Sequence, residues 1–441
     1  RLAAAGRTGA SFGPSHGTAV RASRAQRLSH RIGYGCPAMP TIQRSYRLRI
    51  YPTPAQAQRL ARDFGCARWV WNACLAWRCN LYRAERVSVT GVDFSRELTF
   101  LKRLPGYEWL AEAPATVLAQ KLRDQDRAFA NFFAGRAKFP RFKKRRHAQS
   151  IRYQLDQRIV AGLYRPGELL KLPKLGALKV RWSRLPAGIP KLVTVSRDAA
   201  GRYFASFMVE EKVQPLPEKP NGVGVDLGVK HVAVTSDGER FGDVRPLRRI
   251  RRRLKHAQRL LARKRKGSGN WHRQRQCVAR LHARLADARR ELLHQTSHRL
   301  IAGAGLIAIE DLNVKGMSAS AKGTAERPGR KVKQKAGLNR AIREAGFGEL
   351  RRQLTYKAEW HGRLLVVADR FAPSSKTCSH CGHVLEALPL SVRAWSCPIC
   401  DSAHDRDVNA ARNLLGWATG GGPGTRNDAC GAVTTPEAAA A

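Results

Sequence analysis

Four cysteines in two pairs constrain the fold of this chain more than any other feature. Cys378 and Cys381 form one Cys-x-x-Cys pair, Cys397 and Cys400 form the second, and 15 residues separate the pairs. This spacing is typical of two knuckles that hold one tetrahedral Zn²⁺ ion. A redox-active Cys-x-x-Cys is the alternative, but a redox motif needs no second pair in register. Because four cysteines leave no coordination position open, the pattern predicts a structural rather than a catalytic zinc site.

The second constraint is charge. The 441 residues include 81 Lys and Arg but only 33 Asp and Glu, which gives a formal net charge of +48. A single basic run is as consistent with a solvated helix face, but here basic runs recur at 44–49, 138–146, 248–266 and 340–352. This distribution predicts phosphate contacts along several elements and therefore a nucleic-acid partner.

The apolar runs and the remaining cysteines bear on location. The longest apolar runs, at 306–309 and 364–368, fall far short of the roughly 20 residues that span a bilayer. The N-terminus also lacks the charged-then-apolar pattern of a signal peptide. Cys66, Cys74 and Cys79 lie in apolar helical sequence, which favours buried thiols over a disulfide scaffold. We therefore expect a cytoplasmic protein without membrane contact.

The first half of the chain predicts a strand-rich region into which helices are inserted. Residues 1–38 are rich in Ala, Gly, Arg and Ser, which predicts disorder, and we expect Met39 to be the natural start. Residues 42–50 alternate apolar and basic side chains as in a strand. Helical periodicity follows at 55–84 and 115–133. Short β-like runs lie within 150–210, among them 192–195 and 203–209. Together with the first strand, the β-like runs predict a barrel.

Aromatic residues in this half have two alternative roles. Trp69, Trp71 and Trp77 lie on the first helix, where core packing is favoured over base stacking. Phe139 and Phe142 instead alternate with cations, which suits a nucleic-acid backbone. The residues that we expect to contact nucleic acid are Arg47, Arg49, Lys138, Arg141, Lys143, Lys144, Arg145 and Arg146.

A linker rich in Pro, Glu and Lys at 215–220 precedes a different kind of sequence. A new domain is expected to start near Asn221. From Leu247 onward, apolar residues recur at helical spacing on both sides of a turn at 267–270. This pattern predicts an antiparallel helical hairpin that is apolar on one face and strongly basic on the other.

Two predicted apolar strands in this second half carry acidic residues, one in its interior and one at its end. Asp226 lies within 223–229, and Glu310 and Asp311 end the run from Leu306. A third acidic group, Asp405 and Asp407, opens the predicted final helix. Each acid alone is as well explained by a salt bridge in an Arg-rich chain. Three acids brought together repel one another, so the combination predicts a divalent-cation site that hydrolyses a phosphodiester.

The order and spacing of these motifs resemble one family, the TnpB or OrfB transposase-like proteins of insertion sequences, which are related to type V CRISPR effectors. The strongest matches are at 224–228 (Gly-Val-Asp-Leu-Gly), 309–312 (Ile-Glu-Asp-Leu), 349–358, 373–382 and 405–411 (Asp-Arg-Asp-Val-Asn-Ala-Ala). Weaker matches at 47–52, 131–133, 139–143 and 171–176 extend the resemblance over roughly 42–415. The second cysteine pair departs from the family pattern, because Asp401 replaces a glycine, but all four ligands are present.

The resemblance implies a multidomain protein of mixed α/β and α+β class. Its implied core is an RNase H-like (RuvC) nuclease domain with an inserted four-cysteine zinc ribbon, preceded by a β-barrel wedge domain with an inserted helical recognition lobe. The expected boundaries are 1–38 for an N-terminal extension, 39–54 and 136–214 for the wedge barrel, 55–135 for the helical lobe, 221–370 and 401–418 for the nuclease domain, 371–400 for the ribbon and 419–441 for a flexible tail.

The resemblance further implies an RNA-guided DNA endonuclease encoded by a transposable element. Such a protein binds a guide RNA made from the element's own end and cuts double-stranded DNA beside a short flanking motif. Carried over by motif, Asp226, Glu310 and Asp407 bind two Mg²⁺ ions, with Mn²⁺ as the alternative, and Asp405 assists without being essential. The expected setting is a prokaryotic, nucleoid-associated monomer.

Two other functions remain open from the sequence. A strand-joining transposase also uses metal-bound carboxylates, but the chain has no His-hydrophobic-His tyrosine-nucleophile motif to favour it. A catalytically silent RNA-guided DNA-binding protein is the other alternative, and the presence of all three acids argues against it.

Overall fold

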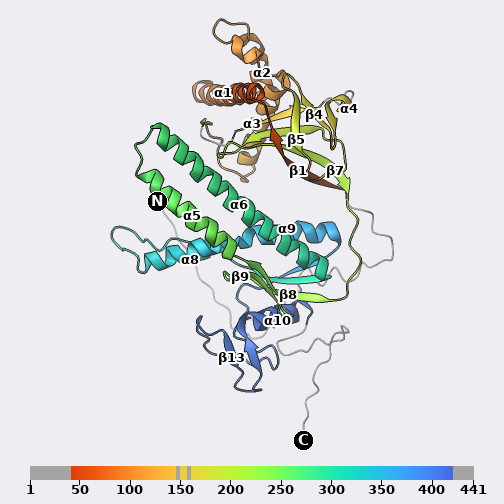
Figure 1. Cartoon of the computed structure of the whole chain (residues 1–441), viewed down its shortest axis with the longest axis vertical. Helices are drawn as coiled ribbons and strands as arrows, with labels where there is room; N and C mark the ends of the chain where they lie inside the picture. Colours follow the sequence, from red (N-terminus) through yellow and green to blue (C-terminus); the bar gives the residue numbers. More distant parts are fainter. Residues whose placement is uncertain (1–40, 146–148, 156–159, 421–441) are drawn as a thin grey trace, which may run out of the picture. The chain divides into compact units, whose positions relative to one another are not determined.

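The computed structural model describes residues 41–145, 149–155 and 160–420 (Figure 1). The expectations for residues 1–38, for Met39 and for Arg146 lie outside the described residues, as does the predicted tail from 421 onward. No described helix is both long enough and apolar enough to cross a membrane.

The first half of the described chain contains a seven-stranded antiparallel sheet. Its strands pair in the order β2-β6-β7-β1-β5-β4-β3. They are β1 (Thr41–Tyr51), β2 (Gln149–Gln154), β3 (Tyr164–Arg165), β4 (Leu169–Leu172), β5 (Gly176–Arg181), β6 (Leu192–Arg197) and β7 (Tyr203–Lys212). The strands predicted at 42–50, 192–195 and 203–209 are therefore confirmed, whereas closure of the sheet into a barrel stays a prediction.

The alternation of apolar and basic residues explains why β1 forms the centre of this sheet. Tyr46, Leu48 and Ile50 point into the core and are at most 6% exposed, whereas the basic residues between them point to the other face. Along its length β1 pairs with β7, and its C-terminal part also pairs with β5. One period-2 pattern therefore supplies both a core and a cationic face.

Helices separate β1 from β2 in the chain. They are α1 (Pro54–Glu85), α2 (Gly91–Leu101), η1 (Glu108–Ala111) and α3 (Ala115–Phe133), and a short α4 (Val160–Leu163) follows β2. The helices predicted at 55–84 and 115–133 are confirmed, but α2 was not predicted. Its start carries a capping box in which the Thr90 side chain accepts from the Asp93 N–H and the Asp93 side chain accepts from the Thr90 N–H.

The second half contains a mixed five-stranded sheet in the order β10-β9-β8-β11-β12. Its strands are β8 (Gly222–Asp226), β9 (His231–Thr235), β10 (Arg240–Asp243), β11 (Leu306–Glu310) and β12 (Leu364–Ala368). β8, β11 and β12 run parallel to one another, whereas β9 is antiparallel to β8 and β10. Residues 213–221, which include the predicted linker, have neither helix nor strand.

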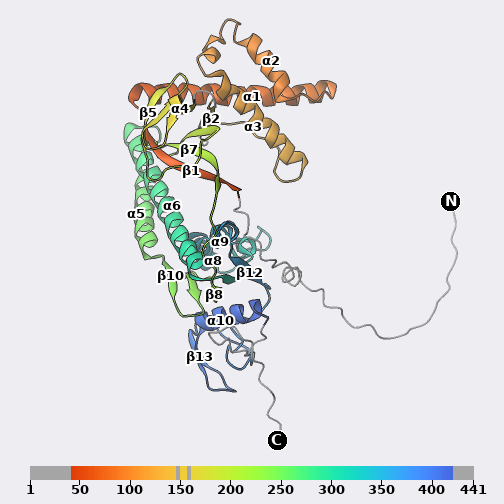
Figure 2. The same cartoon turned by 90° about the vertical axis from the view of Figure 1, so that its right-hand side faces the viewer.

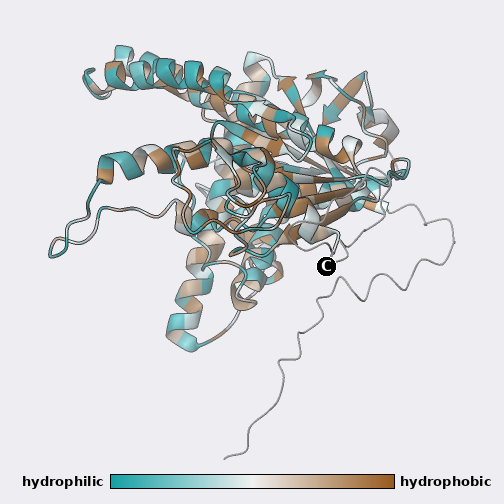
Figure 3. Ribbon diagram, turned by 90° about the horizontal axis from the view of Figure 1, so that it is seen from below, coloured by the Kyte–Doolittle hydropathy of each residue, from teal (hydrophilic) through white to brown (hydrophobic). Residues whose placement is uncertain are grey.

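The second half also contains helices. They are α5 (Arg245–Ala262), α6 (Gly269–Gly303), α7 (Val314–Met317), α8 (Val332–Ala345), α9 (Phe347–His361) and α10 (Arg406–Ala418). Of these, α6, α9 and α10 contact strands of the second sheet. α5 and α6 lie side by side in both views, which confirms the predicted helical hairpin (Figures 1 and 2). The Ser268 side chain caps α6 by accepting from the Trp271 N–H at 3.1 Å. Hydrophobic residues gather on the inner strands, and the outer faces of the helices are largely hydrophilic (Figure 3).

α10 contacts β8 so closely that one glycine is required. A Cβ atom on Gly224 would lie 1.8 Å from the carbonyl oxygen of Ala411, so any other residue would push the helix away from the strand. Gly224 lies two residues before Asp226, and α10 begins next to Asp407. The close approach therefore brings the strand and the helix that carry two of the predicted acids together.

Candidate active site

Asp226 and Glu310 lie at the carboxyl ends of neighbouring parallel strands. In the register of β8 and β11, Val225 pairs with Ile309, so the acid that follows each of them ends its strand at the same edge of the sheet. The two ends are also joined by a hydrogen bond from the Leu227 N–H to Glu310 Oε1 at 3.3 Å. Two acids that are far apart in the sequence therefore become neighbours through strand register alone.

Asp407 joins this edge from the first turn of α10. The Asp405 side chain is the N-cap of that helix, because it accepts from the N–H groups of Asp407 at 3.0 Å and Val408 at 3.2 Å. Asp405 also forms an ion pair with Arg240 on β10 at 2.9 Å. Asp405 therefore anchors and caps the helix start, which accounts for the first acid of the Asp-Arg-Asp motif.

Asp226 lies in the electrostatic field of the other two acids. Burial raises the pKa of Asp226 well above its ordinary value, and the charges of Glu310 and then Asp407 raise it further. Burial also raises the pKa of Glu310 to about 7, although the hydrogen bond from the Leu227 N–H opposes this shift. Ionised carboxylates in such a group need a positive counter-charge.

Arginines of the chain supply part of this positive charge, since the charges of Arg406 and then Arg393 oppose the rise in the pKa of Asp226. Arg393 Nη1 lies 3.1 Å from Asp407 Oδ1, and both side chains are partly exposed. Three hard carboxylate ligands suit Mg²⁺ chemically. Their oxygens do not, however, form a group within 4.8 Å of one another, and within the described ranges the four cysteines are the group that does.

Asp311 forms ordinary salt bridges, which were the alternative role for each acid. Its carboxylate pairs with Arg351 and with Arg370. Those hydrogen bonds, that of Arg351 first, lower the pKa of Asp311. Glu310 and Asp311 therefore have opposite environments. Of these two acids, Asp311 pairs with arginines, whereas Glu310 has no arginine partner among the ion pairs of the described residues.

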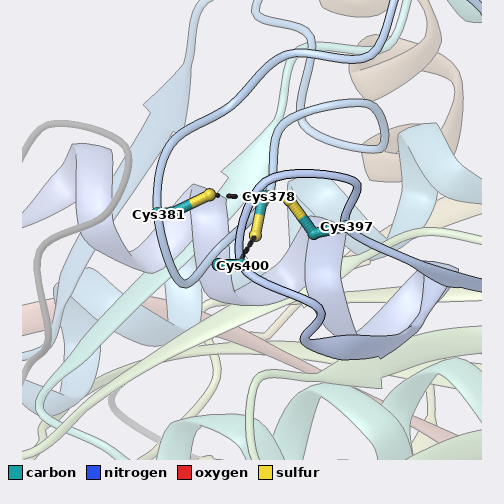
Figure 4. A group of neighbouring side chains, drawn as sticks. All are labelled: Cys378, Cys381, Cys397 and Cys400. Atoms are coloured by element: carbon teal, nitrogen blue, oxygen red, sulfur yellow. Dashed lines mark hydrogen bonds between the residues drawn. The ribbon is translucent and has the colours of Figure 1, made fainter.

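The four predicted cysteines meet near the C-terminal end of the described chain (Figure 4). Sγ of Cys378 lies 3.7 Å from Sγ of Cys400, and Sγ of Cys381 lies 3.6 Å from Sγ of Cys397. A tetrahedral site with Zn–S bonds of about 2.3 Å requires S–S separations of about 3.8 Å. The donor set and its spacing therefore fit one Zn²⁺ ion.

Each cysteine pair forms a tight backbone turn. In the first turn the Gly382 N–H donates to the Cys378 carbonyl at 2.9 Å, and in the second the Asp401 N–H donates to the Cys397 carbonyl at 3.0 Å. Gly382 has φ 81° and Asp401 has φ 53°. Asp401 therefore takes the left-handed conformation that a glycine would take, which Asp tolerates better than most residues. The second turn forms despite the substitution.

Two asparagines that the sequence did not single out connect α10 to the first cysteine turn. Asn409 Nδ2 donates to the Thr377 carbonyl at 2.7 Å, and its Oδ1 accepts from the Ser379 N–H at 2.9 Å. Asn413 Nδ2 donates to the carbonyls of Ser374 at 2.8 Å and Thr377 at 2.7 Å. Both side chains are at most 4% exposed. The sequence signal that could have identified them is a pair of asparagines one turn apart on an otherwise apolar helix face.

His404 is a second residue that the sequence analysis missed. Its Nε2 lies 3.1 Å from Cys378 Sγ, and its ring lies 4.6 Å from that of Trp395. β13 (Ala394–Ser396) and β14 (Ala403–Asp405) pair as a small hairpin that holds these two rings opposite each other. The cysteine cluster therefore packs against the aromatic pair Trp395–His404, which lies directly before α10.

The predicted nucleic-acid contacts fall into two groups. Lys138, Arg141, Lys144 and Arg145 are exposed on a segment without helix or strand. The other described ones, Arg47, Arg49 and Lys143, lie over aromatic rings. The guanidinium groups of Arg47 and Arg49 are 3.8 Å and 5.2 Å from the centre of the Phe204 ring, and Lys143 Nζ is 3.6 Å from the centre of the Trp71 ring.

The tryptophans of α1 pack as predicted. Trp71 is 6% exposed, and Trp69 and Trp77 pack against a core cluster formed by α1, α2 and α3. Core packing was the favoured role for these residues. Trp69 additionally lines a cavity next to α1.

Several families match parts of the chain. A family described as "Probable transposase" matches residues 206–321, and one described as "Cas12f1-like, TNB domain" matches residues 347–414. A third, described as "Helix-turn-helix domain", matches residues 39–86. The described residues of the third match form β1 and the single long helix α1.

Similar proteins match nearly the whole chain. A protein of Streptomyces pristinaespiralis named "Putative RNA-guided DNA endonuclease" is 41% identical over 402 residues, which cover 90% of this chain and 94% of the relative. "Putative RNA-guided DNA endonuclease InsQ" of Escherichia coli (strain K12) is 36% identical over 377 residues, which cover 84% of this chain and 91% of the relative.

Solved structures are more distant. The "Cryo-EM structure of the Cas12f1-sgRNA-target DNA complex" matches with a TM-score of 0.32 and 15% identity over 85% of this chain and 99% of that one. The "Structure of the mini-RNA-guided endonuclease CRISPR-Cas_phi3" matches with a TM-score of 0.41 and 9% identity over 85% and 92%.

Proposed function

The chain belongs to the TnpB, or OrfB-type, family, and from this premise we propose that it is a transposon-encoded RNA-guided DNA endonuclease. Two relatives that match at least nine-tenths of their own length carry that activity in their names. The basic surface of the chain, with a net charge of +48, supports binding to both RNA and DNA.

One observation supports the catalytic part of the proposal. Asp226 and Glu310 end adjacent parallel strands, and the pKa values of both carboxyls are raised by burial. Raised carboxyl pKa values beside a third acid are typical of a cation site rather than of salt bridges. We assign Asp226, Glu310 and Asp407 as the residues that hold two Mg²⁺ ions in an RNase H-like (RuvC) domain. Bound there, divalent cations would supply water activation and charge stabilisation.

The protein's own residues have distinct tasks in this proposal. Asp226 and Glu310 provide a rigid pair of ligands, because strand register and the hydrogen bond to Glu310 Oε1 fix them. Asp405 caps α10 and so orients Asp407. Arg393 balances the charge of Asp407 and lies where a phosphate oxygen would also be attracted.

The cysteine cluster supports the proposal as a structural element. Zn²⁺ is expected to be held by Cys378, Cys381, Cys397 and Cys400, because four thiolates complete its tetrahedral shell. The guide RNA is expected to supply sequence specificity through base pairing, while cationic side chains hold the backbone of the RNA–DNA duplex. The protein would then read only a short motif beside the target.

The proposal is tested by expressing the chain with its native flanking DNA, sequencing the RNA that co-purifies, and challenging the complex with a plasmid library randomised beside the target. Cleavage with Mg²⁺ but not with EDTA is expected. Absence of bound RNA would remove the guide hypothesis, and strand-transfer products would instead favour a strand-joining transposase.

Three variants test the assigned acids in the same assay. Asp226→Ala, Glu310→Ala and Asp407→Ala should each reduce cleavage by roughly a thousandfold or more, since each removes a ligand of the proposed cations, while RNA binding stays intact. Asp237→Ala is the matched control, because Asp237 is an exposed turn acid in the same half of the chain. Normal cleavage by the Asp407 variant would show that the assignment is wrong, and RNA binding without cleavage in the unmodified protein would favour a catalytically silent protein.

A further inference from the structure

A cavity of about 560 Å³ lies beside α1, outside the proposed catalytic site. Its lining includes three small residues and three aromatic ones, namely Gly65, Ala73, Ala76, Trp69, Trp109 and Phe142. The four α1 residues of this set recur at spacings of three and four, so they share one helix face. Small side chains leave the space open, and aromatic rings bound it.

Phe142 is held at this cavity by its two chain neighbours. Trp71 Nε1 donates to the Arg141 carbonyl at 2.9 Å. On the other side, Asn72 Nδ2 donates to the Lys143 carbonyl at 3.0 Å, and the Lys143 N–H donates to Asn72 Oδ1 at 2.7 Å. The Phe142 residue is nevertheless 52% exposed. An exposed aromatic residue whose backbone is held on both sides is a preorganised stacking surface.

The other aromatic walls are also fixed. The rings of Trp69 and Trp109 meet edge to face, with centroids 5.7 Å apart and an interplanar angle of 83°. Trp109 Nε1 donates to the Gly106 carbonyl at 3.1 Å, so its polar atom already has a partner. These rings therefore offer apolar faces and edges to a ligand, and they need no rearrangement to do so.

Cations adjoin the aromatic walls. Arg68 lines the cavity and also a second, much smaller one, of about 30 Å³, whose lining includes Lys143 and Lys144. Within the described part of the chain, no acidic side chain lines either cavity. The positive charge of Arg68, Lys143 and Lys144 therefore repels cationic ligands and attracts a phosphate group. An aromatic cavity next to a cationic one matches the two parts of a nucleotide.

We propose that this cavity binds one unpaired nucleobase of a bound single strand, stacked on Phe142, with the adjoining phosphate near Arg68. The inference rests on the proposed function only in taking nucleic acid as the partner, and it adds a base-binding site that is separate from the carboxylates. Stacking on an aromatic face is tolerant of base identity, because every base has a π-face. The site is therefore expected to order the strand rather than to read its sequence.

Crosslinking locates the site directly. A decauridylate with one 4-thiouridine is bound to the full chain in EDTA and irradiated, and the crosslinked peptides are identified by mass spectrometry. Crosslinks to peptides that carry Trp69, Trp109 or Phe142 are expected. Crosslinks found exclusively elsewhere would overturn the proposal.

Binding measurements test whether stacking is the cause. We expect the chain to bind decauridylate more tightly than an abasic phosphodiester of equal length. Phe142→Ala should lower the affinity for decauridylate about tenfold without changing abasic binding, and Phe142→Trp should restore it. The matched control is Phe100→Ala, since Phe100 on α2 is 60% exposed and lines neither cavity. Equal losses in both alanine variants, or none in either, would contradict the proposal.

The catalytic proposal and this one fail separately. Asp226→Ala should crosslink and bind decauridylate like the unmodified chain, because the cavity does not involve the carboxylates. If the unmodified chain crosslinks normally but does not cleave DNA, only the nuclease proposal is refuted. Normal cleavage with no base-dependent binding at Phe142 would refute only the cavity.

Discussion

The cysteine cluster and the carboxylate group are both proposed metal sites, but they are assembled in different ways. The four sulfurs come from two short turns close together in the chain, and two of their S–S distances, 3.7 and 3.6 Å, nearly equal those of a filled zinc site. The three acids come from β8, β11 and α10, and their oxygens do not form a group within 4.8 Å.

The difference follows from the chemistry of the ligands. Hydrogen-bonded backbone turns hold the four sulfurs in place before any ion is bound. Carboxylates repel one another when ionised, and burial makes that repulsion stronger. Burial raises the pKa values of both Asp226 and Glu310, and the charges of Glu310 and Asp407 raise that of Asp226 further. A cation is therefore expected to change the carboxylate group far more than the cysteine cluster.

The largest expected effect comes from breaking the cysteine cluster. Cys397→Ser removes one of four ligands, so we expect loss of both zinc and cleavage, because α10 and Asp407 depend on the cysteine turns for their position. Zinc content by plasma emission spectrometry and plasmid cleavage are the measurements. Full activity in a zinc-free variant would refute the coupling of the two sites. Cys277→Ser, at an exposed cysteine outside the cluster, is the control.

A smaller effect is expected from the asparagines that connect the two regions. Asn413→Ala leaves the Ser374 and Thr377 carbonyls without one donor, at a cost of about 1–3 kcal/mol. We expect zinc to be retained, while the Mg²⁺ concentration for half-maximal cleavage rises roughly tenfold, as for other supporting residues of metal sites.

Asn339→Ala controls for loss of stability alone. Asn339 is 8% exposed and donates to the Ala319 carbonyl at 2.8 Å, but it lies on α8. Its replacement should lower the melting temperature without shifting the Mg²⁺ requirement. An equal Mg²⁺ shift in both variants would show that Asn413 acts only through stability.

The response to pH distinguishes the carboxylate group from the cysteine cluster. The pKa of Glu310 is raised to about 7 in the folded chain, so its contribution to stability is full below the unfolded value and is lost as the pH rises through about 7. Without metal, stability should therefore fall as the pH rises from about 4.5 to about 7, by up to roughly 1.4 kcal/mol per pH unit, and should level off above pH 7. Mg²⁺ should stabilise the chain more at pH 8 than at pH 6.

Thermal unfolding with and without Mg²⁺ at pH 6, 7 and 8 measures this effect. Glu310→Gln should reduce both the fall in stability and the gain from Mg²⁺, because its side chain does not ionise. A gain from Mg²⁺ that is the same at pH 6 and pH 8 would contradict the assigned role.

The smallest effect is expected at Asp405. Asp405→Ala removes the cap of α10 and the ion pair with Arg240, which should cost about 0.5–2 kcal/mol and slow cleavage only severalfold. Thr53→Ala removes the corresponding cap of α1 and serves as the control, since it should cost similar stability without slowing cleavage. Loss of cleavage as complete as in Asp407→Ala would make Asp405 a ligand rather than a cap.

Many elements were predictable because their signals are local. The strand at 42–50 and the helices at 55–84 and 115–133 follow from periodicity, and the structure has them as β1, α1 and α3 within a few residues. α2 was missed because it is short, with Phe94 and Leu98 among its few buried side chains. Its capping box at Thr90 and Asp93 was a local signal that could have been used.

The roles of individual charged residues were less predictable. Lys143 stacks on Trp71, and Asp311 pairs with two arginines, yet both belong to runs that look uniform in the sequence. Which side chain in a run meets a partner depends on how distant segments pack. Helix and strand periodicity does not contain that information.

The sequence by itself singled out the four cysteines and the three acids and predicted many of the helices and strands, because each depends on spacing within a short segment or on a motif. Only the tertiary structure decided which acids are neighbours and what holds them. Parallel register brings Asp226 beside Glu310, and Gly224 lets α10 approach. Asn409 and Asn413 bind that helix to the cysteine turns. These contacts join segments far apart in the chain, and only packing of the whole fold selects them.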